Sequence, residues 1–183
     1  MLSVGLDNAL EVLTISSNLN NSGTVAVDTG ELRLGWSGTH SGDFTGSDTG
    51  LLNFSGGLQT FDAGTTITAS QVRFSNQSSG VGVYDINGTY EVGETTVIGN
   101  TVEFNSAATT GTLTQTGGIL SGTDTLTVTG LTTFSTGIMS GEGTTRAEGG
   151  LLLNGGLSDI HANRTLVNVS GQTANWTESF KSQ

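Results

Sequence analysis

The sequence carries the motif GILSG at residues 118–122 and repeats it as GIMSG at residues 137–141, an offset of 19 in the numbering. The start of a third copy, Gly156-Leu157, follows at the same offset from the second. Self-similarity at a fixed spacing of this length is the sequence signature of a repeat protein whose units stack on one another. The motif therefore predicts a solenoid in which each repeat forms one coil.

A second internal match has an offset of 30 and pairs VRF at residues 72–74 with VEF at residues 102–104. If this offset also joined equivalent positions of neighbouring repeats, Phe74 and Phe104 would occupy the same place in their coils. We therefore expect these two side chains to be equivalent and to point inward.

A third match has an offset of 99 and pairs GGL at residues 56–58 with GGL at residues 155–157. It divides the chain into two related blocks, about residues 20–78 and 118–178. We expect a single β-solenoid domain over residues 1–183 that is part of a larger protein.

Short alternations of apolar and polar residues indicate strands, as in Leu32-Arg33-Leu34 and Leu126-Thr127-Val128. The chain has 29 glycines and no proline. This composition favours paired strands, because glycine weakens a helix interior and proline cannot donate to a sheet ladder. A sandwich of two sheets would also have short strands, but it does not require self-similarity. The prediction is an all-β, right-handed parallel β-helix of about seven to nine coils.

A series of large apolar residues, each followed by a small polar one, runs through the repeats. If the large residue stacks inward on every coil, the polar residue lies at the turn that follows it. The large residues of the series are Trp36, Phe54, Phe74, Phe104, Phe134, Leu153 and Trp176.

Charge and composition exclude several classes of protein. The chain has 5 Lys and Arg and 16 Asp and Glu, which gives a net charge of −11, so a surface that binds nucleic acid is not expected. The absence of cysteine removes disulfides and thiolate chemistry. No apolar run has the length of a membrane span, and Met1 does not begin a leader pattern, so we expect no membrane insertion.

Four segments carry a likeness to known proteins: GGILSG (residues 117–122), TLTVTG (125–130), GIMSG (137–141) and RTL (164–166). They resemble repeats of very large bacterial surface and secreted proteins of the β-strand-repeat, autotransporter-like and haemagglutinin-like kinds. The likeness is good over about residues 112–177 and looser over 20–75. It implies a right-handed parallel β-helix outside the cell that serves as a stalk, passenger or adhesin, and it brings no catalytic residue.

Candidate catalytic side chains are few. His40 and His161 do not fall at equivalent repeat positions, and we expect both to be surface turn residues. Asp43, Asp62 and Glu91 offer carboxylates for a polysaccharide lyase or hydrolase, which needs acids that converge on one face. Asp62 and Glu91 match at the offset of 30 with one residue inserted, and could also bridge calcium if they stack.

Threonine rows raise an ice-binding alternative, at residues 125–129 and 112–116, although residues 25–27 and 102–104 would interrupt a regular face. The sequence favours a non-enzymatic structural or adhesive module of an extracellular or cell-surface bacterial protein. We predict no catalytic, cofactor-binding or metal-binding residues. The expected partners are surface glycans, host or neighbouring-cell proteins, and adjacent coils of the larger parent chain.

Overall fold

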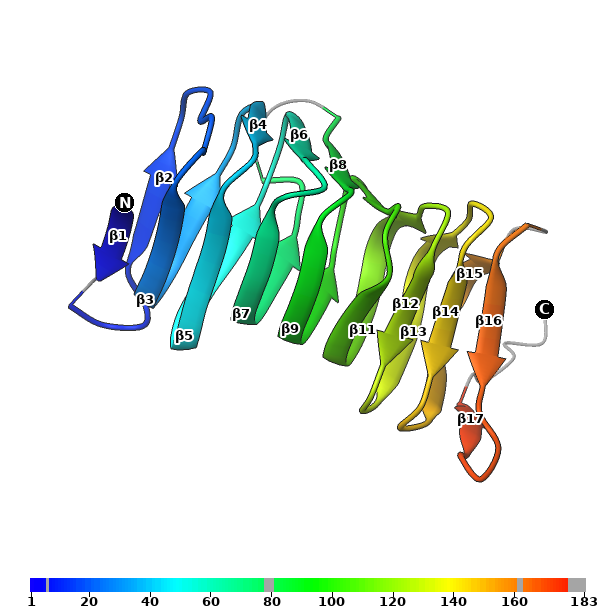
Figure 1. Cartoon of the computed structure of the whole chain (residues 1–183). Coiled ribbons are helices and arrows are strands. Elements are labelled where there is room, and N and C mark those ends of the chain that lie inside the picture. The colour runs from blue at the N-terminus through cyan, green and yellow to red at the C-terminus, as the bar shows by residue number, and fades with distance from the viewer. Residues whose placement is uncertain (6, 78–80, 161–162, 178–183) are drawn as a thin grey trace.

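The chain coils into a parallel β-helix, in which the 17 strands of the described residues pair into one continuous sheet (Figure 1). The computed structural model describes residues 1–5, 7–77, 81–160 and 163–177, with the backbone alone for residues 48 and 156–160. The strands are β1 (Leu2–Gly5), β2 (Val12–Ile15), β3 (Thr24–Leu34), β4 (Gly38–His40), β5 (Asp43–Phe54), β6 (Leu58–Phe61), β7 (Thr66–Phe74), β8 (Val83–Ile86), β9 (Thr89–Val97), β10 (Thr101–Phe104), β11 (Ala108–Ser121), β12 (Thr125–Val128), β13 (Thr132–Met139), β14 (Thr144–Ala147), β15 (Leu151–Ile160), β16 (Thr165–Asn168) and β17 (Ala174–Trp176). The described residues contain no helix, and therefore none that could cross a membrane. The predicted all-β parallel β-helix is confirmed.

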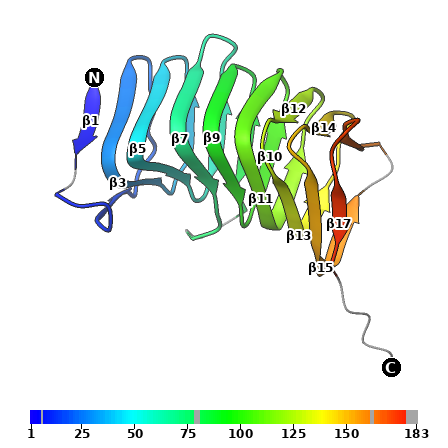
Figure 2. The same ribbon diagram turned by 90° about the horizontal axis from the view of Figure 1, so that it is seen from below.

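The strands of successive coils lie on three faces of the helix. Face 1 consists of β1, the first halves of β3, β5, β7, β9 and β11, and then β12, β14 and β16. Face 2 consists of β2, the second halves of β3, β5, β7 and β9, the middle of β11, the first parts of β13 and β15, and β17. Face 3 consists of β4, β6, β8, β10 and the C-terminal ends of β11, β13 and β15. Figure 2 shows the coils side by side along the axis, with the first and last strands at opposite ends.

The length of each coil follows from the register of face 2. One inward-facing column, here called the inner column of face 2, runs through Ile15, Leu34, Phe54, Phe74, Val97, Gln115, Phe134, Leu153 and Trp176. The differences between these successive residue numbers are the coil lengths, and they vary little around the offset of the repeated motif. The match at an offset of 19 is one coil, since Ile119 pairs with Ile138. The match at an offset of 99 joins positions five coils apart, such as Phe54 and Leu153.

The glycines of the repeated motif stand at corners that require a left-handed backbone. The φ angle is +64° at Gly118 and +109° at Gly122, and it is +106° and +82° at Gly137 and Gly141. Side chains rarely adopt this conformation, and a Cβ at Gly122 would also lie only 2.2 Å from the carbonyl oxygen of Phe104 on the preceding coil. The motif therefore recurs because the same two turns recur on the next coil.

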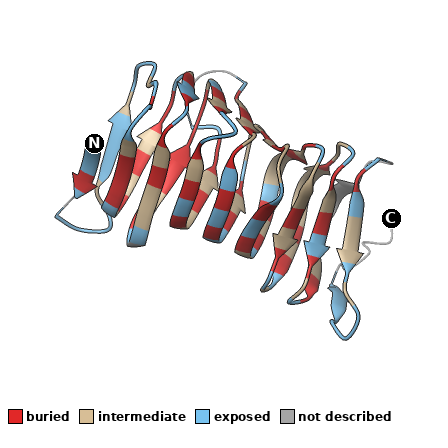
Figure 3. Cartoon of the chain, viewed as in Figure 1, coloured by how far each residue is buried: buried red, intermediate tan, exposed pale blue. Residues whose placement is uncertain are grey.

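The first coils enclose an aromatic core. The rings of Phe54 and Phe74 stack with centroids 5.7 Å apart, and Phe61 meets Phe54 edge-on at 5.1 Å. Burial alternates along the strands, as expected when every second residue points inward (Figure 3). Beyond Phe104 the fully buried apolar side chains are mainly aliphatic. Ser55 and Ser75 directly follow the strands of their phenylalanines, as the series predicted, and both are buried.

Two members of the aromatic series do not belong to the inner column of face 2. Trp36 is 52% exposed and lies two residues past Leu34, which takes the inward position instead. Phe104 is buried, but it pairs with Ile86 on face 3, whereas Phe74 pairs with Val97 on face 2. The predicted inward orientation of Phe74 and Phe104 is confirmed, and their predicted equivalence is wrong.

The match at an offset of 30 combines one coil with a step to the next face. Phe74 leads to Val97 after one coil, and Phe104 ends the following strand on face 3. Short strands on different faces share the same apolar–polar–apolar pattern, because both bury alternate residues in one core. The segments 72–74 and 102–104 are therefore similar in sequence, although they occupy different positions in their coils.

Truncation of Phe74 to alanine should lower the free energy of unfolding by about 3–5 kcal/mol, because a fully buried and stacked ring leaves a cavity. The control Trp36→Ala should cost about 1 kcal/mol or less, since that ring is half exposed. Urea denaturation followed by circular dichroism measures both. Equal losses in the two variants would contradict the assigned register.

Candidate functional site

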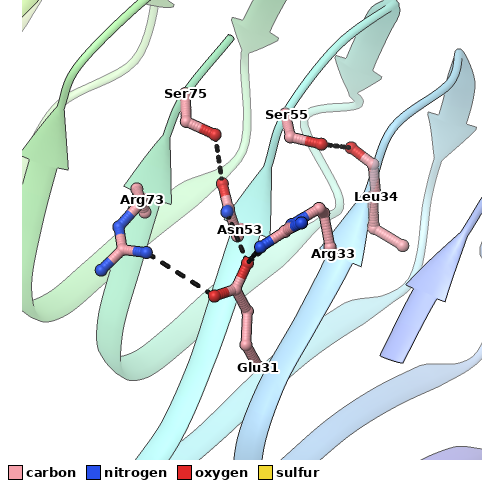
Figure 4. A network of polar contacts seen from close by, with 7 residues as sticks. All are labelled: Glu31, Arg33, Leu34, Asn53, Ser55, Arg73 and Ser75. Atoms are coloured by element: carbon pink, nitrogen blue, oxygen red, sulfur yellow. Dashed lines mark hydrogen bonds and ion pairs between the residues drawn. The ribbon is translucent and has the colours of Figure 1, made fainter. Parts of the chain in front are cut away.

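Five polar side chains form a connected cluster on the outer surface of face 2, across three consecutive coils (Figure 4). This cluster, here called the Glu31 network, consists of Glu31, Arg33, Asn53, Arg73 and Ser75. Arg33, Asn53 and Arg73 occupy one outward column, because Arg33 pairs with Asn53 and Asn53 pairs with Arg73. Glu31 lies in the adjacent column, two residues before Arg33.

The carboxylate of Glu31 is the centre of the network. Its Oε1 accepts hydrogen bonds from Arg33 Nε at 2.8 Å and from Asn53 Nδ2 at 2.7 Å. Its Oε2 lies 3.6 Å from Nη1 of Arg73, two coils away from Glu31 along the axis. The Glu31 side chain is only 12% exposed, against 26% for Arg33 and 31% for Arg73. The two cations therefore cover the anion.

Asn53 links the network to the core. Its side chain is buried, and its Oδ1 accepts a hydrogen bond of 2.8 Å from Ser75 Oγ. Ser75 itself directly follows the inward Phe74. A buried amide whose donor and acceptor are both used is fixed in orientation, so Asn53 holds the Glu31 carboxylate against the sheet.

A groove of about 430 Å³ opens beside the network. Its polar lining includes Glu11, Glu31, Thr49, Gln71 and Arg73, and its apolar lining includes Ala9, Leu10, Val12 and Leu51. A volume of this size falls within the range of roughly 300–1,000 Å³ that is typical of small-molecule sites. The groove is therefore large enough to hold a small-molecule ligand.

Two irregular corners between faces 1 and 2 raise the rim of the groove. In β5 the chain takes five residues from Gly46 to Leu51, whereas the paired segment of β7 takes two residues from Ala69 to Gln71. The extra residues bulge outward, and Thr49 Oγ1 donates to the carbonyl of Asp28 at 3.1 Å. On the first coil the turn before β2 is closed by Glu11, whose carboxylate accepts hydrogen bonds from Asp7 N at 3.0 Å and Asn8 Nδ2 at 3.1 Å.

The sequence contains a signal for the network that the three internal matches missed. LRL at residues 32–34, LNF at 52–54 and VRF at 72–74 follow one another at a constant interval. Each interval is the length of one coil, and the two successive coils are equally long, so the middle residues form one outward column. The match at an offset of 30 aligned VRF with VEF instead, and that choice hid the column.

The three candidate acids do not form a common site. Asp43 begins β5 on face 1, and the exposed Asp62 lies at the corner after β6. Glu91 points outward from face 1, where it pairs with Thr68 and Thr109. Asp62 and Glu91 do not stack, because Phe61, which precedes Asp62, pairs with Ile86 on face 3, whereas Glu91 pairs on face 1. In the described part of the chain, no three His, Cys, Asp or Glu side chains gather as metal ligands would.

His40 is a core residue and not the surface turn residue that the sequence suggested. Its ring is fully buried, with its centroid 4.9 Å from those of Phe44 and Phe61. Nε2 lies 2.7 Å from Gln59 Oε1, which accepts when that nitrogen carries the proton. Burial lowers the pKa of His40 below its usual value, against smaller opposing effects of Gln59 and Asp62. His161 lies outside the described residues.

Threonines form columns on the outer surface of face 1. One column contains Thr24, Asp43, Thr66, Thr89, Ala107, Thr125, Thr144 and Thr165, and the next contains Ser3, Ala26, Thr45, Thr68, Glu91, Thr109, Thr127, Arg146 and Val167. Of the two segments expected to interrupt a threonine face, residues 102–104 lie on face 3 and only 25–27 lie on face 1. The row expected at residues 112–116 lies in the middle of β11, on face 2.

No protein-family model matches the chain, and neither the curated proteins nor the solved structures contain a match.

Acid should destabilise the protein through His40. Because burial lowers the pKa in the folded state, the unfolded chain binds a proton first as the pH falls below about 6.5. The contribution of His40 to stability is therefore complete above that pH and is lost progressively below it. The free energy of unfolding, measured in urea from pH 7.5 to 5, should fall more steeply in the parent than in His40→Gln.

The two proteins share every other titratable group, so the difference between their pH profiles isolates His40. Parallel profiles would contradict a neutral, buried imidazole at this position.

Proposed function

We propose that the chain is a non-enzymatic structural or adhesive module of an extracellular or cell-surface bacterial protein. The observation that best supports this proposal is the continuous pairing of the stacked coils. It extends from β1 to β16 on face 1 and from β2 to β17 on face 2. Each coil hydrogen-bonds to its neighbours along its faces, and its inward side chains interlock in one core. Such a stack resists bending and presents three long outward surfaces for recognition.

The positions of the polar groups favour binding over acid–base catalysis. Asp43, Asp62 and Glu91 occupy different columns or corners, whereas the arginines of the Glu31 network share one column beside a groove. Arginine held in place by a carboxylate is suited to recognising a polar partner. The proposed partners of the outer surfaces are glycans and proteins of a host or neighbouring cell.

The two end rungs suit contact with further coils. Leu13 and Trp176 belong to inward columns, yet they are 39% and 67% exposed because they lie at the first and last rungs of face 2. A further coil stacked on either rung would cover an apolar side chain and pair an open strand edge. These surfaces fit the adjacent coils of a larger parent chain.

A structural module of this kind should lengthen by whole coils. Two extra copies of residues 118–136 inserted after residue 136 add two coils in register, since Ile119 already pairs with Ile138. X-ray scattering in solution should show a rod longer by about 10 Å, because parallel strands lie about 4.8 Å apart. The melting temperature should be retained.

The control is an insertion at the same place of one full copy and the first half of a second, which is one and a half coils long. It shifts inward residues outward and should lower the melting temperature by several degrees. If the two insertions behaved alike, the chain would not be an extensible rod and the proposal would fail.

We propose ice binding as a second candidate, on the strength of the threonine columns of face 1. Their hydroxyl and methyl groups repeat about 4.8 Å apart between coils and about 6.6 Å apart along a strand. A regular two-dimensional grid of this kind can order water on its surface, as binding to a crystal lattice requires. The grid is interrupted by charged residues and by apolar ones, namely Asp43, Glu91, Arg146, Ala26, Ala107 and Val167.

If face 1 binds ice, the protein should slow the recrystallisation of ice, and Thr127→Tyr should abolish the effect because the larger side chain disrupts the grid. Thr101→Tyr, an outward position on face 3, is the matched control and should leave the effect unchanged. Absence of any effect in the parent protein would exclude this function.

A further inference from the structure

We propose that the groove beside Arg73 binds the carboxylate-bearing sugar of an acidic polysaccharide, an assignment that rests on the proposed adhesive role. Arg73, Gln71 and Thr49 line the groove from one side of the network, and Leu10, Val12 and Leu51 supply its apolar walls. A sugar acid combines the same two features, because its ring has apolar faces and its edges carry hydroxyl and carboxylate groups.

Arg73 is the cation of the network with donors to spare. Its Nη1 lies 3.6 Å from Glu31 Oε2, which is longer than a hydrogen bond, so Glu31 does not hold the terminal nitrogens tightly. The Arg73 Nε has no hydrogen-bond partner among the described residues but is buried, so a ligand would bind the terminal nitrogens. Arg33 differs, because its Nε and Nη2 both lie within 2.8 Å of Glu31 Oε1. The Arg73 side chain is 31% exposed and lines the groove, so a ligand can reach its guanidinium.

A carboxylate is the group that this guanidinium fits best. The planar fork of arginine binds the two oxygens of a carboxylate in parallel, and such charged hydrogen bonds are stronger than neutral ones. Glu31 does not fill that role, because its Oε1 is held by Arg33 and Asn53. The second acid of the groove, Glu11, accepts two hydrogen bonds within its own turn.

The polar side chains around Arg73 suit the remainder of a sugar. Glu31, Thr49 and Gln71 bring carboxylate, hydroxyl and amide groups to the groove wall, and each type can bond a sugar hydroxyl. Leu51 and Val12 belong to the same outward column as Glu31, so an apolar strip lies beside the polar groups. Polar and apolar groups on adjacent columns match the edge and the face of one ring.

Calorimetric titration with trigalacturonate tests the proposal. The probe is short, because the net charge of −11 repels a long polyanion. The parent protein should bind trigalacturonate, and its fully methyl-esterified form should bind about tenfold more weakly or not at all, since the ester has no charge for Arg73. Triglutamate, which has carboxylates but no sugar rings, should bind as weakly as the ester.

Substitutions of Arg73 and Arg146 test where trigalacturonate binds. Arg73→Gln should weaken trigalacturonate binding by about tenfold or more, and Arg73→Lys should weaken it less, because lysine keeps the charge and loses the fork. Arg146→Gln is the matched control: it removes the same charge from face 1, where Arg146 pairs with Glu148 at 2.7 Å, and it should bind as the parent does. Circular dichroism and melting temperature establish that each variant is folded.

Several results would overturn the assignment. No binding of trigalacturonate by the folded parent protein, or equal binding of ester and acid, would remove the acidic sugar as the ligand. Equal losses in Arg73→Gln and Arg146→Gln would show binding to net charge only, and equal binding of triglutamate would show a general carboxylate site. The coil-insertion experiment does not involve the groove, so any of these results would leave the structural proposal standing.

Discussion

Hydrogen bonding between successive coils is the interaction on which the rest of the structure depends. The amides of Ser55, Ser75 and Ile98 each donate to a carbonyl of the preceding coil at 2.9 Å, where the inner column of face 2 turns into the next corner. Because neighbouring strands are parallel, a residue that slips by one position loses its partner and moves its side chain to the other side of the sheet. The register therefore determines which residues form the core and which outward residues become neighbours. The Glu31 network exists because two successive coils of equal length place Arg33, Asn53 and Arg73 in one column.

Differences in coil length are accommodated at the corners and not in the strands. Coil lengths vary, yet the columns continue, because the additional residues of the longer coils lie outside the paired strands, as in the turn at residues 169–173 between β16 and β17. The core adapts as well. After the aromatic coils, Tyr90, Thr95 and Thr110 join their hydroxyls at 2.8 and 2.9 Å, and Thr110 reaches the carbonyl of Thr112 at 2.9 Å. These bonds satisfy hydroxyls that would otherwise be costly to bury, so threonine can occupy an inward position of face 1 at Thr110 and of face 2 at Thr95.

The sequence predicted the architecture better than the site. The matches at offsets of 19 and 99 correspond to one and five coils, because they were anchored on motifs at corners, and the glycines of GILSG and GIMSG have a left-handed backbone there. The match at an offset of 30 failed because strands on different faces share one pattern of alternation, and this error hid the column of Arg33, Asn53 and Arg73. The burial of His40 could not be read from its neighbours in sequence, since the rings of Phe44 and Phe61 reach it from other strands. The groove depends on two irregular corners, and no periodic pattern encodes those.

The stacking of coils also determines how the molecule would respond to a pulling force. Each coil touches its immediate neighbours, and the chain winds around the axis, so tension applied at an end would peel one coil from the stack before it loaded the next. A released coil of about 20 residues would supply roughly 65–70 Å of extended chain, whereas the stack would shorten by only about 4.8 Å. An anchored rod of this design would lengthen in steps under load, and it would dissipate energy at each step while the remaining coils kept their outer surfaces intact.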